Sequence, residues 1–118
     1  MDNRRQFSRV IFAADAILSD KHETWPTKIQ DLSLNGALVE QPAGFSELQT
    51  PLTLSFKLAE SDIVITMETQ LVHKKNGLLG LQCLHIDIDS ISHLRRMLEL
   101  NLGDASLLDR ELKMLFAS

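Results

Sequence analysis

The sequence predicts a mainly β protein in which six antiparallel strands close into a barrel and C-terminal helices pack at one end. The first observation is order along the chain, because strand-like segments come first and helical periodicity appears only in residues 89–118. The second is that no helical segment separates the strands, which favours an antiparallel sheet that curls on itself. The third is size, since 118 residues with 44% hydrophobic content suit one domain with a real core.

The predicted strands share short length, β-branched or aromatic residues, and polar turns at their ends. They span residues 9–18, 25–31, 37–40, 52–58, 63–74 and 78–86. We expect the second strand to be interrupted, and Pro26, which lacks an N–H, suits a strand start or an edge. A turn is predicted over residues 33–36 because Asn35 and Gly36 tolerate positive φ angles.

The last two strands are predicted to form a hairpin around Lys74-Lys75-Asn76-Gly77, since Asn-Gly suits a tight turn. Alternation supports the first of these two strands. The residues that share one parity in it are Ile63, Ile65, Met67, Leu71 and His73. Residues 41–51 contain two prolines and a glycine, so they are predicted to form a loop.

Two helices are predicted after the strands. Asp89 or Ser90 can cap the first helix, and Gly103 suits its C-terminal end. Asp104 can cap the second helix, whose apolar face runs to Phe116. The apolar residues at helical spacing in the first helix are Ile91, Leu94, Leu98 and Leu102.

Charge is distributed unevenly along this single domain, residues 1–118. We divide the domain into a flexible basic arm (1–8), a barrel (9–88) and C-terminal helices (89–118). Residues 1–9 carry a net charge of +2, whereas the whole chain carries −4. This distribution favours a local anion site over a broad basic face, so neither nucleic-acid nor membrane binding is expected.

The predicted cellular compartment follows from features that the sequence does not show. Cys83 is the only cysteine, so no intramolecular disulfide can form. The sequence shows neither a signal peptide nor a long apolar span, and we expect a cytoplasmic protein. His85, Asp87 and Asp89 have no metal-like spacing, so no metal site is expected.

Arg4, Arg5 and Arg9 place three guanidinium groups within six residues. Guanidinium is planar, permanently charged and able to bind phosphate oxygens with two parallel hydrogen bonds. These arginines therefore predict an anion-binding arm. The alternative is a solvated basic tail.

A second motif, Asp31-Leu32-Ser33-Leu34-Asn35-Gly36, carries polar groups that share one side of a strand end. The Asp31 carboxylate could accept from the N1–H and N2–H edge of guanine, with the Ser33 hydroxyl nearby. Gly36 would let the backbone approach a ligand without a Cβ. The alternative is a plain turn in which Asp31 and Ser33 bond to neighbouring backbone.

The spacing Arg5-x-x-x-Arg9, followed along the chain by Asp31-x-Ser33-x-x-Gly36, resembles the two signatures of the PilZ domain family. That family binds the bacterial second messenger cyclic di-GMP on a six-stranded antiparallel β-barrel. The chain is most similar in kind to small stand-alone PilZ proteins of gammaproteobacteria.

The resemblance implies a role for each matching residue. Arg5 and Arg9 would hold phosphates and guanine, with Arg4 as a third contact, and Asp31, Ser33 and Gly36 would read a guanine. It also implies that two ligand molecules can bind as an intercalated dimer. The signal would then leave by conformational change to an unidentified protein partner.

Other functions remain as alternatives. A nucleotide-independent adaptor with the same fold is the main one. An enzyme is not expected, because the sequence shows no metal cluster or paired general acid and base, and no cofactor is expected beside the ligand. For stacking on a guanine, His73 is the candidate and Trp25 is the runner-up, and each could instead be an ordinary strand residue.

Overall fold

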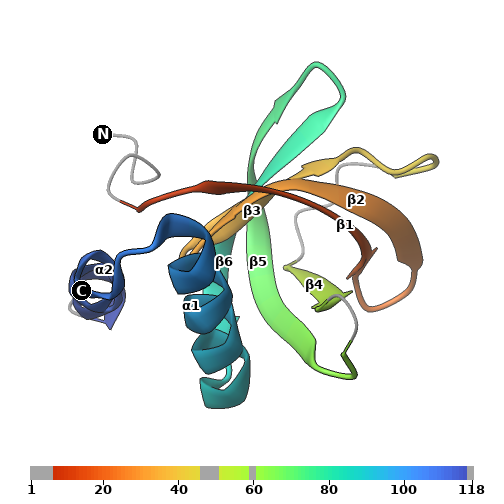
Figure 1. Ribbon diagram of the computed structural model, residues 1–118. Coiled ribbons are helices and arrows are strands. Elements are labelled where there is room, and N and C mark those ends of the chain that lie inside the picture. The colour runs from red at the N-terminus through yellow and green to blue at the C-terminus, as the bar shows by residue number, and fades with distance from the viewer. Residues whose placement is uncertain (1–6, 46–50, 59–60, 117–118) are drawn as a thin grey trace.

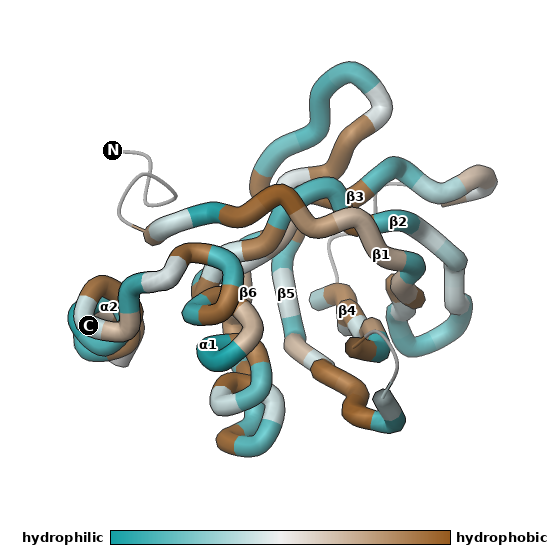
Figure 2. Tube along the Cα trace, viewed as in Figure 1, coloured by the Kyte–Doolittle hydropathy of each residue, from teal (hydrophilic) through white to brown (hydrophobic). Residues whose placement is uncertain are grey.

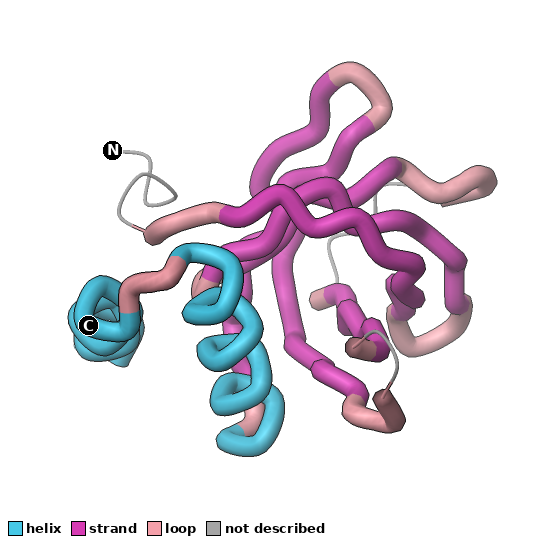
Figure 3. The backbone as a smooth tube through the Cα atoms, viewed as in Figure 1, coloured by secondary structure: helices cyan, strands magenta, loops and turns pink. Residues whose placement is uncertain are grey.

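The computed structural model describes residues 7–45, 51–58 and 61–116, and it confirms the predicted β-barrel with two C-terminal helices (Figure 1). Six antiparallel strands close in the order β1-β2-β3-β6-β5-β4, and β4 pairs with β1. The strands are β1 (Val10–Ser19), β2 (Thr24–Ser33), β3 (Gly36–Glu40), β4 (Leu52–Lys57), β5 (Val64–Lys75) and β6 (Leu78–Ile86). Figure 3 shows the two helices together on one side of this barrel.

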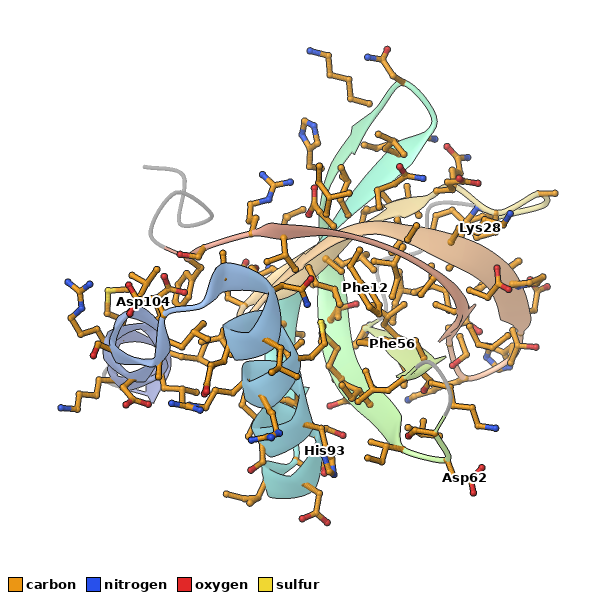
Figure 4. All side chains as sticks on the ribbon, in the orientation of Figure 1. Phe12, Lys28, Phe56, Asp62, His93 and Asp104 are labelled. Carbon is orange, nitrogen blue, oxygen red and sulfur yellow. The ribbon has the colours of Figure 1, made fainter. Side chains whose placement is uncertain are left out.

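The strands form because apolar side chains alternate toward the barrel interior. In β4, for example, Leu52, Leu54 and Phe56 are buried and the residues between them are not. Figure 2 shows this alternation of apolar and polar residues along several strands. Inside the barrel the rings of Phe12 and Phe56 lie 5.9 Å apart in a tilted pair (Figure 4). Burial of these faces is the main stabilising contribution to the fold.

The second strand is continuous from Thr24 to Ser33, so the predicted interruption is wrong. The pairing of this strand with β3 has a register shift between Ile29 and Asp31. A β-bulge of this kind lets a strand bend and re-aims the side chains that follow it. Ile29 faces the core, whereas Asp31 faces outward.

Two turns illustrate different uses of Asn-Gly. In the β5–β6 hairpin, Asn76 and Gly77 have φ angles of 55° and 77°, which confirms the predicted turn. In the β2–β3 turn, neither Asn35 nor Gly36 has a positive φ, so the reason given for that turn was wrong. The β2–β3 connection runs through Leu34 and Asn35, both of which are buried.

The first helix, α1 (Ile88–Leu102), begins one residue before the predicted boundary and is capped by Asp87 rather than by Asp89 or Ser90. Asp87 has an extended backbone, and its carboxylate accepts from the Ser90 amide at 2.9 Å. Ser90 is instead buried, and its hydroxyl accepts from the Thr66 amide on β5 at 3.0 Å. Gly103 ends the helix in the left-handed conformation, as predicted.

The second helix, α2 (Ala105–Phe116), is capped by Asp104, whose carboxylate accepts from the Leu107 amide at 3.0 Å (Figure 4). Leu108 is fully buried beneath it. Arg95 of α1 bonds to Asp109 of α2 at 2.6 Å and to Glu99 within α1 at 2.6 Å. Arg95 therefore joins the two helices through an ion pair.

Candidate anion-binding site

Arg9 and Asp31 meet at the rim of the barrel, although 22 residues separate them in the sequence. Val10, the next residue, pairs with Leu32 across β1 and β2, which brings the two side chains together. The Asp31 carboxylate accepts from Arg9 Nη2 at 2.6 Å and from Arg9 Nε at 3.3 Å. The pair is only partly covered, with side-chain exposures of 39% for Arg9 and 18% for Asp31.

This ion pair borders a small hollow that contains the predicted polar motif. Guanidinium has five N–H groups, and Asp31 engages one on each of two nitrogens, so Arg9 retains donors for an anion. The residues that line the hollow come from the segment just before β1, from β2, β3 and β6, and from the β2–β3 turn. They are Arg9, Asp31, Ser33, Asn35, Gly36, Ala37, Leu38 and Leu81.

Gly36 is required by packing between strands. A Cβ built at this position would collide with the backbone carbonyl oxygen of Leu81 on β6. Gly36 pairs with Gln82, so β3 and β6 approach more closely here than a side chain allows. The expectation that Gly36 makes room for a ligand is thus joined by a structural requirement.

The Ser33 hydroxyl is engaged inside the β2–β3 turn. It donates to Asn35 Oδ1 at 2.9 Å, and both residues are 4% exposed. The Asn35 carbonyl in turn accepts from the Cys83 amide on β6 at 2.7 Å. Ser33 can therefore offer a ligand its acceptor lone pairs while its proton stays within the turn.

The start of the described chain is held on its other side by α2. Phe7 is buried in the core, and Ser8 donates to the carboxylate of Glu111. The Ser8 amide lies 3.0 Å from Oε1 and 3.1 Å from Oε2, and the Ser8 hydroxyl lies 2.6 Å from Oε2. Phe7 and Ser8 fall within the range predicted as a flexible arm, yet both make specific contacts with the body.

Arg4 and Arg5 lie outside the described residues. His73 lies on the outer face of the barrel in the same cross-strand row as Asp31, and it is exposed. The row runs from Asp31 to Leu38 on β3, to Gly80 on β6 and to His73 on β5. Three strand spacings put His73 about 14 Å from Asp31.

His73 faces outward because a register shift separates it from Leu71. Leu71 pairs with Leu81, which is buried, whereas His73 pairs with Gly80 on the outer row. His73 has the same parity as Leu71, but the register shift between them means that parity alone does not put the two side chains on one face. The bulge re-aims the imidazole toward the outer surface.

Trp25, the alternative stacking residue, is 5% exposed and packs edge-to-face on Phe45 at 5.1 Å. It lies on β2 six residues before Asp31, about 20 Å away along the strand. Trp25 is therefore a core residue at the other end of the barrel.

Two residues that fix the neighbours of the candidate site were not found from the sequence. Asn35 was considered only as a turn former, although its side chain fixes the Ser33 hydroxyl. Glu111 carried no signal, because one polar residue on an amphipathic helix usually faces solvent. Its partner Ser8 lies 103 residues away, a separation that no local pattern reveals.

Another hollow of the described surface lies away from these motifs, with a volume of about 680 Å³. Residues of β1, β2, β3 and β4 line it, among them Asp15, Lys28, Glu40 and Lys57 (Lys28 is labelled in Figure 4). Asp15 lies six residues from Arg9, about 20 Å along β1. This hollow contains both acidic and basic side chains, so its charge favours no particular class of ligand.

Cys83, beside the turn, is half-buried, and burial raises the pKa of its thiol to about 11. A thiol with such a pKa is protonated near neutral pH and is a poor nucleophile. Within the described ranges, no group of three or more His, Cys, Asp or Glu side chains could hold a metal ion. Nor does any helix there have the length and apolar character needed to cross a membrane.

A family model, described as the PilZ domain, matches residues 3–100. The match covers both arginine and turn motifs and the whole barrel. The chain belongs to the PilZ domain family. PilZ domains typically bind cyclic di-GMP, and the contact between Arg9 and Asp31 joins the two motifs by which the sequence resembles this family.

Solved PilZ structures resemble this fold. The PilZ domain of CeSA from a cellulose-synthesizing bacterium has a TM-score of 0.63 at 15% identity, covering 82% of this chain and 99% of that one. The Bacillus subtilis inhibitor of motility, MotI/DgrA, has a TM-score of 0.66 at 22% identity. That match covers 81% of this chain and 52% of MotI/DgrA. A Legionella uncharacterized protein, Lpg0364, has a TM-score of 0.53 at 14% identity, covering 81% of this PilZ chain and 95% of its own.

Proposed function

We propose that this PilZ protein is a receptor for cyclic di-GMP that acts in the cytoplasm and signals to a protein partner. The observation that carries the proposal is the bidentate contact of Arg9 with Asp31 beside the Ser33–Gly36 turn. It brings the two signatures of the family to one place with a permanent positive charge on the surface. Family membership makes cyclic di-GMP the first ligand to test.

Asp31 orients Arg9 for this task. A carboxylate that accepts from two guanidinium nitrogens fixes the plane of the group, which reduces the entropy lost when an anion binds. The remaining N–H groups of Arg9 are available to a phosphate or to the O6 and N7 acceptors of guanine. Arg4 and Arg5 are proposed to add phosphate contacts from the preceding residues.

His73 is proposed to stack on a base of the same ligand. It shares the outer row with Asp31, and Gly80 and Leu38 between them present no polar side chain to a purine. An imidazole gives a smaller stacking surface than indole, so its contribution falls at the low end of the 1–3 kcal/mol typical for an aromatic residue. An intercalated ligand dimer would place additional bases along this row.

The second candidate function is a nucleotide-independent adaptor. The observation in its favour is that the Ser33 hydroxyl and the Asp31 carboxylate are both engaged within the protein. One structural neighbour of the same fold is titled an inhibitor of motility. If the protein is a nucleotide-independent adaptor, adding nucleotide should leave the contacts of Arg9, Asp31 and Ser33 unchanged.

Isothermal titration calorimetry with cyclic di-GMP separates the two functions, with cyclic di-AMP as the ligand control. We expect saturable binding of cyclic di-GMP, and the molar ratio distinguishes one bound molecule from two. Recovery of intact nucleotide after incubation with the protein would support a receptor over an enzyme. Absence of heat with cyclic di-GMP, at several temperatures, would favour the adaptor.

A further inference from the structure

We propose that Glu111 of α2 is a positioning residue for the nucleotide site and that it couples α2 to ligand binding through Ser8. This inference rests on the proposed function, because the ligand it invokes is cyclic di-GMP. Its physical basis is one set of contacts, in which the amide and hydroxyl of Ser8 both donate to the Glu111 carboxylate. Figure 1 shows the N-terminal end of β1 on the same side of the barrel as α2.

Ser8 stands directly before Arg9, just ahead of β1, and the two residues contact different parts of the protein. Ser8 bonds to Glu111 on the helical side, while Arg9 bonds to Asp31 on the barrel side. The two contacts together fix the direction of the backbone at Ser8 and Arg9, and from there the Arg9 side chain reaches the hollow. Loss of the Glu111 contact would therefore free the backbone that carries Arg9.

The Glu111 contact is built into the core rather than placed on the surface. Glu111 is 2% exposed, and the neighbouring Phe7 and Leu108 are buried as well. A buried carboxylate is costly unless its oxygens accept hydrogen bonds, so α2 docks well only while Ser8 supplies donors. The position of the chain start and the docking of α2 are thus mutually dependent.

The rest of the α2 attachment consists of one ion pair and of apolar packing by Leu112 and Leu115. Arg95 ties α2 to α1 through Asp109, whose side chain is 59% exposed. An exposed ion pair of this kind contributes about 0–1 kcal/mol. Within the described part of α2, Leu108 and Glu111 are the buried residues, and Leu112 and Leu115 pack against the core beside them. A change at Ser8 caused by ligand binding has a direct route to this helix.

The sign of the coupling follows from the geometry. The arrangement with Ser8 on Glu111 is the one in which Arg9 borders the hollow, so the docked helix and the ligand-competent arm belong to one state. Ligand that binds this state stabilises the docking of α2, and docked α2 strengthens ligand binding by the same factor. Residues 105–116 would then report nucleotide occupancy to a partner.

The test compares Glu111→Gln with Asp109→Asn, two carboxylate-to-amide changes on the same helix. Glu111→Gln places an amide nitrogen opposite the Ser8 donors, whereas Asp109→Asn leaves Ser8 untouched. We expect Glu111→Gln to bind cyclic di-GMP about tenfold more weakly than wild type and Asp109→Asn to match wild type. Ser8→Ala, which removes only the hydroxyl at the chain start, should weaken binding by about threefold even if Glu111→Gln folds poorly.

Hydrogen exchange supplies the readout that a merely structural role would not give. Cyclic di-GMP should slow exchange in residues 105–116 of wild type and of Asp109→Asn, but not of Glu111→Gln. Equal affinities for Glu111→Gln and Asp109→Asn, or unchanged exchange in α2 of wild type on binding, would overturn the coupling while the proposed receptor function stands. Failure of wild type to bind would instead overturn the receptor function, and the coupling with it.

Discussion

Two carboxylates hold adjacent residues at the start of this PilZ chain, and their surroundings differ. Asp31 binds Arg9 at the rim of the barrel, where both side chains keep contact with solvent. Glu111 binds Ser8 beneath α2, where only 2% of the glutamate is exposed. Water and salt screen the first pair, so its contribution to stability is small, whereas loss of a partner in the second leaves a buried polar group unpaired.

The difference suggests that the Arg9–Asp31 contact and the Ser8–Glu111 contact have different roles. A partly exposed arginine that keeps free donors can exchange contacts with an incoming phosphate at little cost. A buried contact cannot exchange so easily, but it can transmit a change in the chain to the helix on which it lies. The predictions below separate binding at the rim from stability at the helix.

Gly36→Ala should produce the largest loss of stability, and it tests the packing of the barrel beside the Arg9–Asp31 contact. The new Cβ meets the backbone carbonyl of Leu81, which cannot move without parting β3 from β6. We expect a loss of about 3 kcal/mol in the free energy of unfolding, measured by urea denaturation. Gly44→Ala is the control for a glycine with open space around it, although its own φ of 77° adds a smaller strain.

Arg9→Ala should weaken cyclic di-GMP binding by about 100-fold, because it removes charge-assisted hydrogen bonds. Its melting temperature should stay close to that of wild type, since the lost ion pair with Asp31 is partly exposed. Arg96→Ala, a matched change at an exposed site on α1, should alter neither quantity. If Arg9→Ala binds cyclic di-GMP with wild-type affinity, Arg9 at the rim of the barrel is not part of the binding site.

Glu111→Ala and Asp31→Ala sharpen the comparison when measured side by side for stability. Glu111→Ala should lower the free energy of unfolding by about 2 kcal/mol, because the Ser8 donors lose their buried acceptor. Asp31→Ala should cost less than about 1 kcal/mol. Denaturant curves that rank the two variants in the opposite order would contradict the proposed division.

His73→Ala should give the smallest effect, about a fivefold loss of affinity for cyclic di-GMP with no change in stability. His85→Ala is the matched control, since His85 is exposed on β6 and pairs with Glu68 outside the row of Asp31. His73→Trp should bind more tightly than wild type because indole offers a larger stacking surface. Equal affinity of all three variants with wild type would exclude His73 from the site.

Local signals in the sequence predicted much of the fold. Alternating apolar residues marked the strands, and Asn76-Gly77 and Gly103 marked a turn and a helix end through their backbone angles. The cap of α1 was misplaced because Asp87, Asp89 and Ser90 all suit a cap, and only burial of Ser90 against β5 decides among them.

The candidate site was predicted in its residues but not in its geometry. Motif spacing identified Arg9, Asp31 and Ser33, and pairing of β1 with β2 brings the first two together. The bulges that turn Asp31 and His73 outward depend on how strands pair, which alternation alone does not reveal. The Ser8–Glu111 contact joins the two ends of the chain and becomes visible only once both are folded.

A crystal structure of the protein with bound cyclic di-GMP tests the central proposal most directly. The account predicts a phosphate or guanine edge within hydrogen-bond distance of the Arg9 guanidinium, over the hollow that Asp31, Ser33 and Gly36 line. Nucleotide bound elsewhere, for example in the groove lined by Asp15 and Lys28, with Arg9 still directed only at Asp31, would contradict it.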